Sequence, residues 1–257
     1  MEMELKVALV QSHLIWENPE ANRERFAEKI DGITNEVDLI VLPEMFTTGF
    51  TMKPNEIDTS EGERTLQWME DCASKKNTAL CGSLVFNEKN HYFNRLFFVL
   101  PEGEHFHYDK KHTFTLAGEN KVYKAGNKKV VFEYKGFRIC PLICYDLRFP
   151  VWARNREDYD ILIYVANWPK PRINAWDALL KARAIENMAY CIGVNRIGLD
   201  GMGHEYPGHS AVYDVLGNGL GYTEREEVIY ATLSKEHVEN YRTKLRFLAD
   251  RDAFNLI

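Results

Sequence analysis

The 257-residue chain lacks the features that would place it in a membrane or on nucleic acid. It has no apolar run of about 18 residues, so no membrane span is expected. The N-terminus, MEMELKVALVQ, has neither the basic start nor the long apolar segment of a secretory signal, and it predicts the first strand of the fold. The net charge of -6 lacks the basic excess that usually accompanies nucleic-acid binding. We expect a cytoplasmic protein that binds neither nucleic acid nor a membrane.

Cysteine is scarce, and its arrangement argues against both disulfides and zinc. The five cysteines are Cys72, Cys81, Cys140, Cys144 and Cys191. An odd number spread through apolar surroundings does not make the usual disulfide framework. No CxxC pair is present, and no histidine pair lies near Cys140 and Cys144 at the spacing of a zinc site. We therefore expect a reducing setting and no metal.

Motifs for nucleotide cofactors and for serine nucleophiles are missing as well. There is no GxGxxG after a predicted strand, no GxxxxGK[ST] and no GxSxG. No linker rich in glycine, serine or proline divides the chain, and there is no internal repeat. With 45% hydrophobic and 27% charged residues, the chain has the composition and the length for one globular core. We expect a single domain over residues 1–257.

What the sequence does contain is an alternation of strand and helix patterns. A helix is predicted to begin at Asn18-Pro19, and others at 63–75 and 176–188. The charged tail at about 234–257 predicts a helix followed by an irregular arm. Pro141 lies inside a predicted strand and predicts a local bend. Apolar runs predict strands at 5–10, 37–42, 78–86, 92–100, 105–108, 130–134, 137–143, 161–166, 190–196, 210–214 and 228–233, which makes a mixed α/β protein.

A cysteine stands where one of these strand patterns gives way to a loop, the position at which ligands bind in many α/β proteins. Cys144, in PLICYDLRFP, follows an apolar strand, and polar residues begin directly after it. Such a boundary suits a nucleophile, which must be reachable and needs a nearby positive charge to lower its pKa. Cysteine is also among the most buried residue types, so the same pattern fits a core residue at the end of a strand.

Glu44 and Lys110 occupy comparable positions. Glu44 follows the apolar run DLIVLP, where partial burial would raise the pKa of the carboxyl group and suit it to acid–base chemistry. Lys110, in YDKKHTF, is placed to offer a cation to a developing oxyanion. The local patterns also fit a surface carboxylate and a solvated basic turn. A cysteine–histidine pair of the papain type stays open too, because there are eight histidines, although the small residues of that motif are missing.

In this order, LPEMF, YDKKHTF and CYDLRFP resemble the nitrilase superfamily of carbon-nitrogen hydrolases. AGENKVYKAG, ANWP, KARAIENMAYCIGVNR and GHSAVYDVLG fit the same family, so the resemblance covers nearly the whole chain. CYDLRFPVWARN and ANWPKPRINAWDALLKARAIENMAY are most similar to the bacterial omega-amidases, relatives of the eukaryotic Nit proteins. The resemblance implies a four-layer α-β-β-α sandwich, no metal or organic cofactor, and a homodimer or higher homo-oligomer formed through helices.

The resemblance also implies a role for each matching residue. Cys144 is similar to the family's nucleophile, Glu44 to its general base, and Lys110, two residues before a histidine, to its lysine. Glu119, in AGENKVYKAG, is similar to a second glutamate that positions the lysine or assists proton transfer. The backbone N–H of Tyr145 is the expected second donor to the oxyanion. With Lys110 and Glu44 on either side, we expect Cys144 to favour its charged form.

The activity that the resemblance implies is hydrolysis of the terminal amide of 2-oxo acid omega-amides, such as 2-oxoglutaramate and 2-oxosuccinamate, through a thioester. The far carboxylate of such a substrate needs a cation, for which Arg148, Arg172 and Lys170 are candidates. Arg148 also fits a structural ion pair. Candidates for the pocket wall are Phe46, Phe114 and Trp168, although aromatic residues are also common in cores.

Two alternatives stay open. An aliphatic amidase, a carbamoylase or a nitrilase shares the same glutamate, lysine and cysteine, so these residues do not separate the activities. A binding or scaffold protein that keeps the fold without catalysis is the second alternative. The intact Glu44, Lys110 and Cys144 argue against it.

Overall fold

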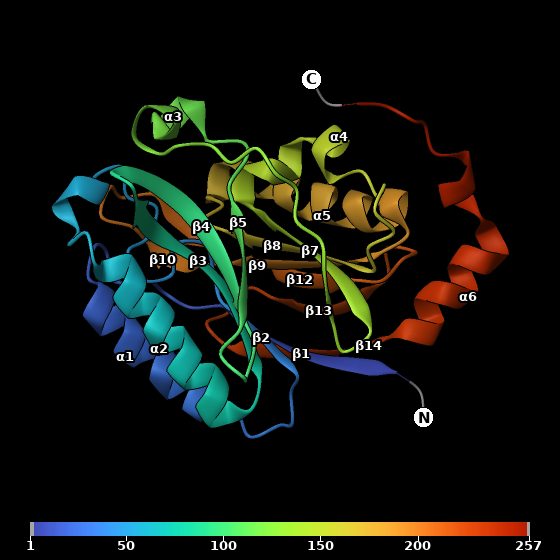
Figure 1. Ribbon diagram of the computed structural model, residues 1–257, viewed down its shortest axis with the longest axis horizontal. Coiled ribbons are helices and arrows are strands. Elements are labelled where there is room, and N and C mark those ends of the chain that lie inside the picture. Colours follow the sequence, from blue (N-terminus) through green and yellow to red (C-terminus); the bar gives the residue numbers. More distant parts are fainter. Residues whose placement is uncertain (1–2, 256–257) are drawn as a thin grey trace.

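Two six-stranded sheets pack face to face at the centre of the molecule (Figure 1). The computed structural model describes residues 3–255, so the two terminal residues at each end of the expected domain, which include the tip of the C-terminal arm, lie outside the described residues. The first sheet consists, in spatial order, of β14 (Val228–Ser234), β1 (Glu4–Val10), β2 (Leu39–Val41), β3 (Ala79–Glu88), β4 (His91–Val99) and β5 (His105–Asp109). The second consists of β13 (Gly219–Thr223), β12 (Ser210–Tyr213), β9 (Tyr190–Asn195), β8 (Ile161–Ala166), β7 (Phe137–Ile143) and β6 (Phe132–Tyr134).

Helices cover the outer face of each sheet and complete four layers. α1 (Pro19–Asp31) and α2 (Glu61–Lys76) lie against the first sheet, and α5 (Ile173–Asn187) lies against the second (Figure 1). In β1, Val7 and Leu9 belong to the core between the sheets, whereas alternate residues of the same strand belong to the core under α1 and α2. A strand that is covered on both faces is apolar throughout. The expected four-layer α-β-β-α sandwich is confirmed.

The strand directions bring several strand ends to the same place. β1, β2 and β3 are parallel, and so are β7, β8 and β9. β4 is antiparallel to both β3 and β5, so β5 runs in the same direction as β2. The carboxyl ends of β2 and β5 therefore meet at one edge of the first sheet. The carboxyl ends of β7, β8 and β9 meet at one edge of the second.

Local signals in the sequence determine where the first and last α-helices begin. Asn18 accepts a hydrogen bond from the backbone of Ala21 (3.2 Å), and Pro19 opens α1 as predicted. Ser234 caps α6 (Lys235–Leu245) in the same way, by accepting from the backbone of His237 (3.2 Å). In the described part of the tail, α6 is followed by a 3₁₀ helix at Phe247–Asp250 and then by residues without regular structure. No helix between residues 3 and 255 is long and apolar enough to cross a membrane.

The structure differs from the sequence prediction in short or glycine-rich strands. The prediction missed the two-stranded sheet of β10 (Ile197–Leu199) and β11 (Glu205–Pro207), as well as β13. These segments are short and rich in glycine and polar residues, so they carry neither an apolar run nor a clear alternation. Through Pro141, β7 pairs with β8 in an unbroken register, so their pairing has no bulge there. β7 pairs with β6 only as far as Ile139, so the missing N–H of Pro141 interrupts no bond to β6.

Candidate active site

Three strand ends deliver a glutamate, a lysine and a cysteine to one place between the two sheets. Glu44 follows β2, Lys110 follows β5, and Cys144 follows β7. Lys110 Nζ lies 2.8 Å from Glu44 Oε1 and 3.0 Å from both carboxylate oxygens of Glu119. Lys110 and both glutamates are almost fully buried, and Cys144 lines the same cavity as Lys110. The four residues that the sequence singled out are thus neighbours in space.

The turn that carries Cys144 has an unfavourable backbone conformation. Cys144 has a φ of +43°, in the left-handed region that non-glycine residues rarely adopt. Such a conformation costs on the order of 1–3 kcal/mol and persists only where surrounding contacts impose it. Asp146 supplies these contacts, because its carboxylate accepts from the Ile143 backbone (3.1 Å), the Tyr108 hydroxyl (2.8 Å) and the His112 backbone (3.0 Å). Asp146 therefore ties the cysteine turn to the segment that carries Lys110.

Two asparagines that the sequence prediction did not single out hold the Glu44 carboxylate. The backbone N–H of Asn167 donates to Glu44 Oε2 (2.7 Å), and Asn94 Nδ2 donates to Glu44 Oε1 (2.8 Å). The side chain of Asn167 also donates to the backbone carbonyl of Glu44 (2.6 Å). Asn167 lies in ANWP, directly after β8, so its place at a strand end was a usable signal. Asn94 lies in the middle of β4, where the only signal is a polar residue in an apolar run.

The electrostatics of the site favour a charged lysine. Burial disfavours the ammonium form, but the neighbouring Glu119 and Glu44 carboxylates outweigh this effect and raise the pKa of Lys110 above its usual value. Burial raises the pKa of Glu119, and the Lys110 ammonium partly offsets that rise. The site therefore presents one buried cation held between two carboxyl groups.

The surroundings of Cys144 favour the neutral thiol over the thiolate, which is the opposite of the expectation from the sequence. Burial raises the pKa of Cys144 well above the usual value of a thiol, and the Glu44 carboxylate raises it further. The Lys110 ammonium acts in the opposite direction but does not compensate. The thiol must therefore lose its proton when it attacks, and Glu44 is the carboxylate beside it.

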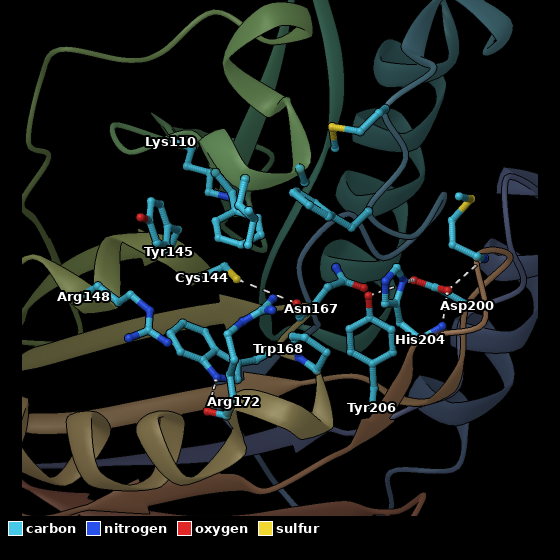
Figure 2. Close-up of a pocket in the computed structure, with 17 residues that line it drawn as sticks. Lys110, Cys144, Tyr145, Arg148, Asn167, Trp168, Arg172, Asp200, His204 and Tyr206 are labelled. Atoms are coloured by element: carbon cyan, nitrogen blue, oxygen red, sulfur yellow. Dashed lines mark hydrogen bonds and ion pairs between the residues drawn. The ribbon is translucent and has the colours of Figure 1, made fainter.

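A cavity of about 370 Å³ opens from Cys144 to the surface (Figure 2). Five candidates from the sequence line it together with Lys110 and Asn167, namely Phe114, Tyr145, Arg148, Trp168 and Arg172. Glu44 and Glu119 lie behind the wall and do not line the cavity.

Two sequence candidates lie elsewhere. Phe46 is fully buried in the core under α1 and α2, with its ring centroid 5.4 Å from that of Phe26. It is a core residue because the chain turns back under α2 directly after Glu44. Lys170 is exposed, and Glu205 binds its ammonium group at 2.8 Å. Neither Phe46 nor Lys170 lines the cavity.

Two guanidinium groups in the cavity wall lack an acidic partner. Arg148 stacks over the ring of Trp168, and Arg172 over the ring of Phe114, each with its guanidinium carbon 5.0 Å from the ring centroid. Among residues 3–255, neither arginine forms an ion pair, so the structural ion pair considered for Arg148 is not present. A cation without a protein counter-ion in a cavity wall is suited to binding an anionic ligand.

The β10–β11 hairpin forms the other side of the cavity in the view of Figure 2. Asp200 accepts hydrogen bonds from the Tyr206 hydroxyl and from the backbone of His204, each at 2.9 Å. The ring of Tyr206 also stacks against buried Arg196, whose guanidinium carbon lies 4.6 Å from the ring centroid. The sequence prediction missed these residues because it missed the hairpin. In the described part of the chain, no three His, Cys, Asp or Glu side chains gather in a way that could hold a metal ion.

Comparisons with known proteins agree with this geometry. Residues 6–243 match the family model described as carbon-nitrogen hydrolase. The chain is 44% identical over 254 residues to the omega-amidase YafV of Escherichia coli strain K12, and the match covers 98% of each chain. It is 31% identical over 232 residues to the 2-oxoglutaramate amidase of Bacillus subtilis strain 168, with 88% of this chain and 89% of that protein covered. The crystal structure of XC1258 from Xanthomonas campestris, a CN-hydrolase superfamily protein with an arsenic adduct in its active site, superposes with a TM-score of 0.95 at 37% identity, and covers 99% of both chains.

Proposed function

The chain belongs to the carbon-nitrogen hydrolase family, and we propose that it is an omega-amidase with Cys144 as its nucleophile. The substrate is a 2-oxo acid omega-amide such as 2-oxoglutaramate or 2-oxosuccinamate, and the products are the dicarboxylate and ammonia. The observation that carries this proposal is a cysteine beside a buried Glu44–Lys110–Glu119 group, in a cavity whose wall holds two guanidiniums that form no ion pair with any of residues 3–255. The names of the relatives from E. coli and B. subtilis support the same substrate class.

The first half of the reaction makes a thioester. Glu44 takes the proton of Cys144 as Sγ forms a bond to the amide carbon, and the carbonyl oxygen becomes an oxyanion. The Lys110 ammonium and the backbone N–H of Tyr145 stabilise that oxyanion, and one such donor is typically worth about 3 kcal/mol. Tyr145 lies in the first turn of the 3₁₀ helix Cys144–Arg148, where backbone N–H groups have no partner within the helix. Glu44 then passes its proton to the nitrogen, the C–N bond breaks, and ammonia leaves.

The second half hydrolyses the thioester. Glu44 accepts a proton from water as the water oxygen attacks the thioester carbon. The C–S bond breaks, the carboxylic acid leaves, and the proton on Glu44 returns to Cys144. Glu119 holds Lys110 through two contacts of 3.0 Å and thereby keeps the ammonium in place throughout both steps.

Arg148 and Arg172 are the proposed binding groups for the far carboxylate of the substrate. Both line the cavity with Cys144, and arginine can bind a carboxylate through two parallel hydrogen bonds. Trp168 and Phe114 hold the guanidiniums from one face and form the apolar wall of the cavity.

A substrate panel with ammonia detection tests the proposed activity. It contains 2-oxoglutaramate, 2-oxosuccinamate, neutral aliphatic amides, N-carbamoyl compounds and nitriles. We expect the two oxo acid amides to have the highest kcat/KM, because only they combine a primary amide with a carboxylate for the arginines. If a nitrile, a carbamoyl compound or a neutral amide has a higher kcat/KM, the protein is not an omega-amidase but has one of the other activities of the family.

We also propose that the protein is a cytoplasmic homodimer. The loop after β12 places Leu216 (37% exposed) next to α5, where Ile185 is 45% exposed and contacts Gly217. Exposed apolar side chains that gather on one face are typical of an interface. All five cysteines are free thiols, which suits a reducing compartment. Light scattering on a size-exclusion column should give a dimer for the wild type and a monomer for Ile185→Glu. A wild-type monomer would contradict the dimer.

A further inference from the structure

Asn94 is the one residue of β4 that contacts all three members of the buried charged group among the described contacts. Its side-chain nitrogen donates to Oε1 of Glu44 (2.8 Å) and to Oε1 of Glu119 (3.3 Å). Its backbone carbonyl accepts from the backbone N–H of Lys110 (3.0 Å). Asn94 is 1% exposed and does not line the cavity, so it has no direct access to a substrate.

The contacts form a closed ring of four atoms. Lys110 Nζ binds Oε1 of Glu44 and Oε1 of Glu119, and Asn94 Nδ2 binds the same two oxygens. Each Oε1 atom therefore receives two donors, one charged and one neutral. Glu44 Oε2 receives only the backbone N–H of Asn167 among the described hydrogen bonds (2.7 Å). Oε2 therefore has a second acceptor position that no described hydrogen bond fills.

The orientation of the Asn94 amide follows from this ring. In the opposite orientation its carbonyl oxygen would face two carboxylate oxygens with no proton between them. In the observed orientation the carbonyl oxygen is buried and has no hydrogen-bond partner among residues 3–255. A buried acceptor without a donor is unfavourable, so β4 keeps Asn94 at a cost to stability. A residue needed only for packing would avoid that cost.

We propose that Asn94 is a positioning residue that reserves Oε2 of Glu44 for the proton of Cys144, by fixing Oε1 against Lys110. This inference rests on the proposed roles of Glu44 and Cys144, and it goes beyond them by assigning a task to a residue that touches neither the substrate nor the reacting atoms. Without Asn94, Oε1 of Glu44 has one donor fewer. The Glu44 carboxylate is then free to rotate, and either of its oxygens can bind Lys110.

Four variants test the assignment. Asn94→Ala removes the donor. Asn94→Asp keeps the shape but puts an oxygen against the two carboxylates. Asn94→Ser keeps one short donor. Asn87→Ala on neighbouring β3 is the matched control, because Asn87 is a half-buried asparagine in the same sheet that contacts none of the three charged residues.

The kinetic readout separates positioning from a structural role. We expect Asn94→Ala to lower kcat by about 10- to 100-fold with KM within about twofold, a loss typical of a misplaced catalytic group. The pH profile of kcat should also move to higher pH, because Glu119, whose pKa burial already raises, loses a donor that favours its charged form. Asn94→Asp should lose more activity than Asn94→Ala, and Asn94→Ser less. The groups that titrate close to Glu44 and can contribute to this profile are Lys110, Glu119, Cys144 and Tyr123.

A second readout does not depend on the substrate. Alkylation of Cys144 by iodoacetamide, measured against pH by mass spectrometry, follows the loss of the thiol proton directly. If the alkylation profile shifts in Asn94→Ala and stays unchanged in the control, the positioning role of Asn94 is supported, even if the oxo acid amides prove to be poor substrates. An unchanged alkylation profile and unchanged kcat would overturn the proposal. The proposal would also be overturned if the fall in kcat across the three Asn94 variants were proportional to the fall in Tm. If Asn94→Ala does not fold, the same measurements of kcat, alkylation and Tm are compared between Asn94→Ser and Asn94→Asp.

Discussion

The buried charged group beside Cys144 and the two arginines of the cavity wall differ in how far the protein satisfies their charges. Glu44, Lys110 and Glu119 are almost fully buried, and Lys110 binds both glutamates, while two asparagines bind Glu44. In the wall, the guanidiniums of Arg148 and Arg172 rest on aromatic rings and form no ion pair within the described part of the chain. The first group is complete without a ligand, and the second is completed by one. The difference suggests that the buried group performs the chemistry and that the wall selects the substrate.

Replacement of the nucleophile should have the largest effect. Cys144→Ala removes the atom that forms the thioester, and we expect kcat to fall by at least about 10⁴-fold. The cavity wall is unchanged, so binding of the substrate should persist. Measurement of kcat by ammonia release, and of Kd by calorimetry with 2-oxoglutaramate, separates the two parts of the site. Full turnover in Cys144→Ala would assign the chemistry to another group.

Replacement of the general base should have the second largest effect on kcat. Glu44→Gln keeps the size of the side chain but cannot accept the thiol proton, so we expect kcat to fall by about 10²- to 10⁴-fold. Because the Glu44 carboxylate raises the pKa of Cys144, its replacement by neutral Gln should lower that pKa, and alkylation by iodoacetamide should begin at a lower pH in the variant than in the wild type. Turnover near the wild-type value would show that the thiol loses its proton to another base.

The arginines of the wall should affect binding more than turnover. Arg148→Met and Arg172→Met each remove a charged partner of the far carboxylate, a contact worth about 1.5–3 kcal/mol. We expect KM for 2-oxoglutaramate to rise by about 10- to 100-fold, while kcat/KM for a neutral amide changes little. Lys170→Met is the matched control, because Lys170 binds Glu205 outside the cavity. If the ratio of kcat/KM for 2-oxoglutaramate to kcat/KM for the neutral amide is unchanged in both variants, neither arginine binds the far carboxylate.

Cys140 lies within β7 and away from the cavity, whereas Cys144 follows the same strand and lines the cavity. Cys140 is fully buried, and burial raises its pKa to about 12 from a usual value of 9.0. Since its pKa is higher in the folded than in the unfolded state, its contribution to stability is fully present below pH 9. That contribution is lost as the pH rises toward 12, by about 1.4 kcal/mol per pH unit.

Chemical denaturation at several pH values checks this smallest effect. The free energy of unfolding should fall less steeply between pH 9 and 11 in Cys140→Ala than in the wild type. Ile139→Val, an equally buried neighbour that does not titrate, should lower stability by the same amount at every pH. Parallel curves for Cys140→Ala and the wild type would show that the thiol does not ionise on unfolding in this range.

The sequence predicted the parts of the fold and site that have strong local signals. Long apolar strands, the cap at Asn18 and the side chains at strand ends were all predicted, because each depends on residues close together in the chain. The β10–β11 hairpin was missed because its strands have only three residues each and the turn between them contains Gly201 and Gly203. Asn94 was missed because its role depends on Glu44, Lys110 and Glu119, which reach it only through the sheet order. Phe46 was misplaced for a similar reason, since the sequence does not reveal the direction of the chain after Glu44.

One trapping experiment tests the central claim most directly. The enzyme is mixed with 2-oxoglutaramate, quenched with acid within a turnover, and digested for mass spectrometry. The account predicts that the peptide containing Cys144 gains the mass of a 2-oxoglutaryl group, and that the peptides of the other four cysteines do not. An adduct on another residue, or turnover without any adduct when release of the acid is the slow step, would contradict it.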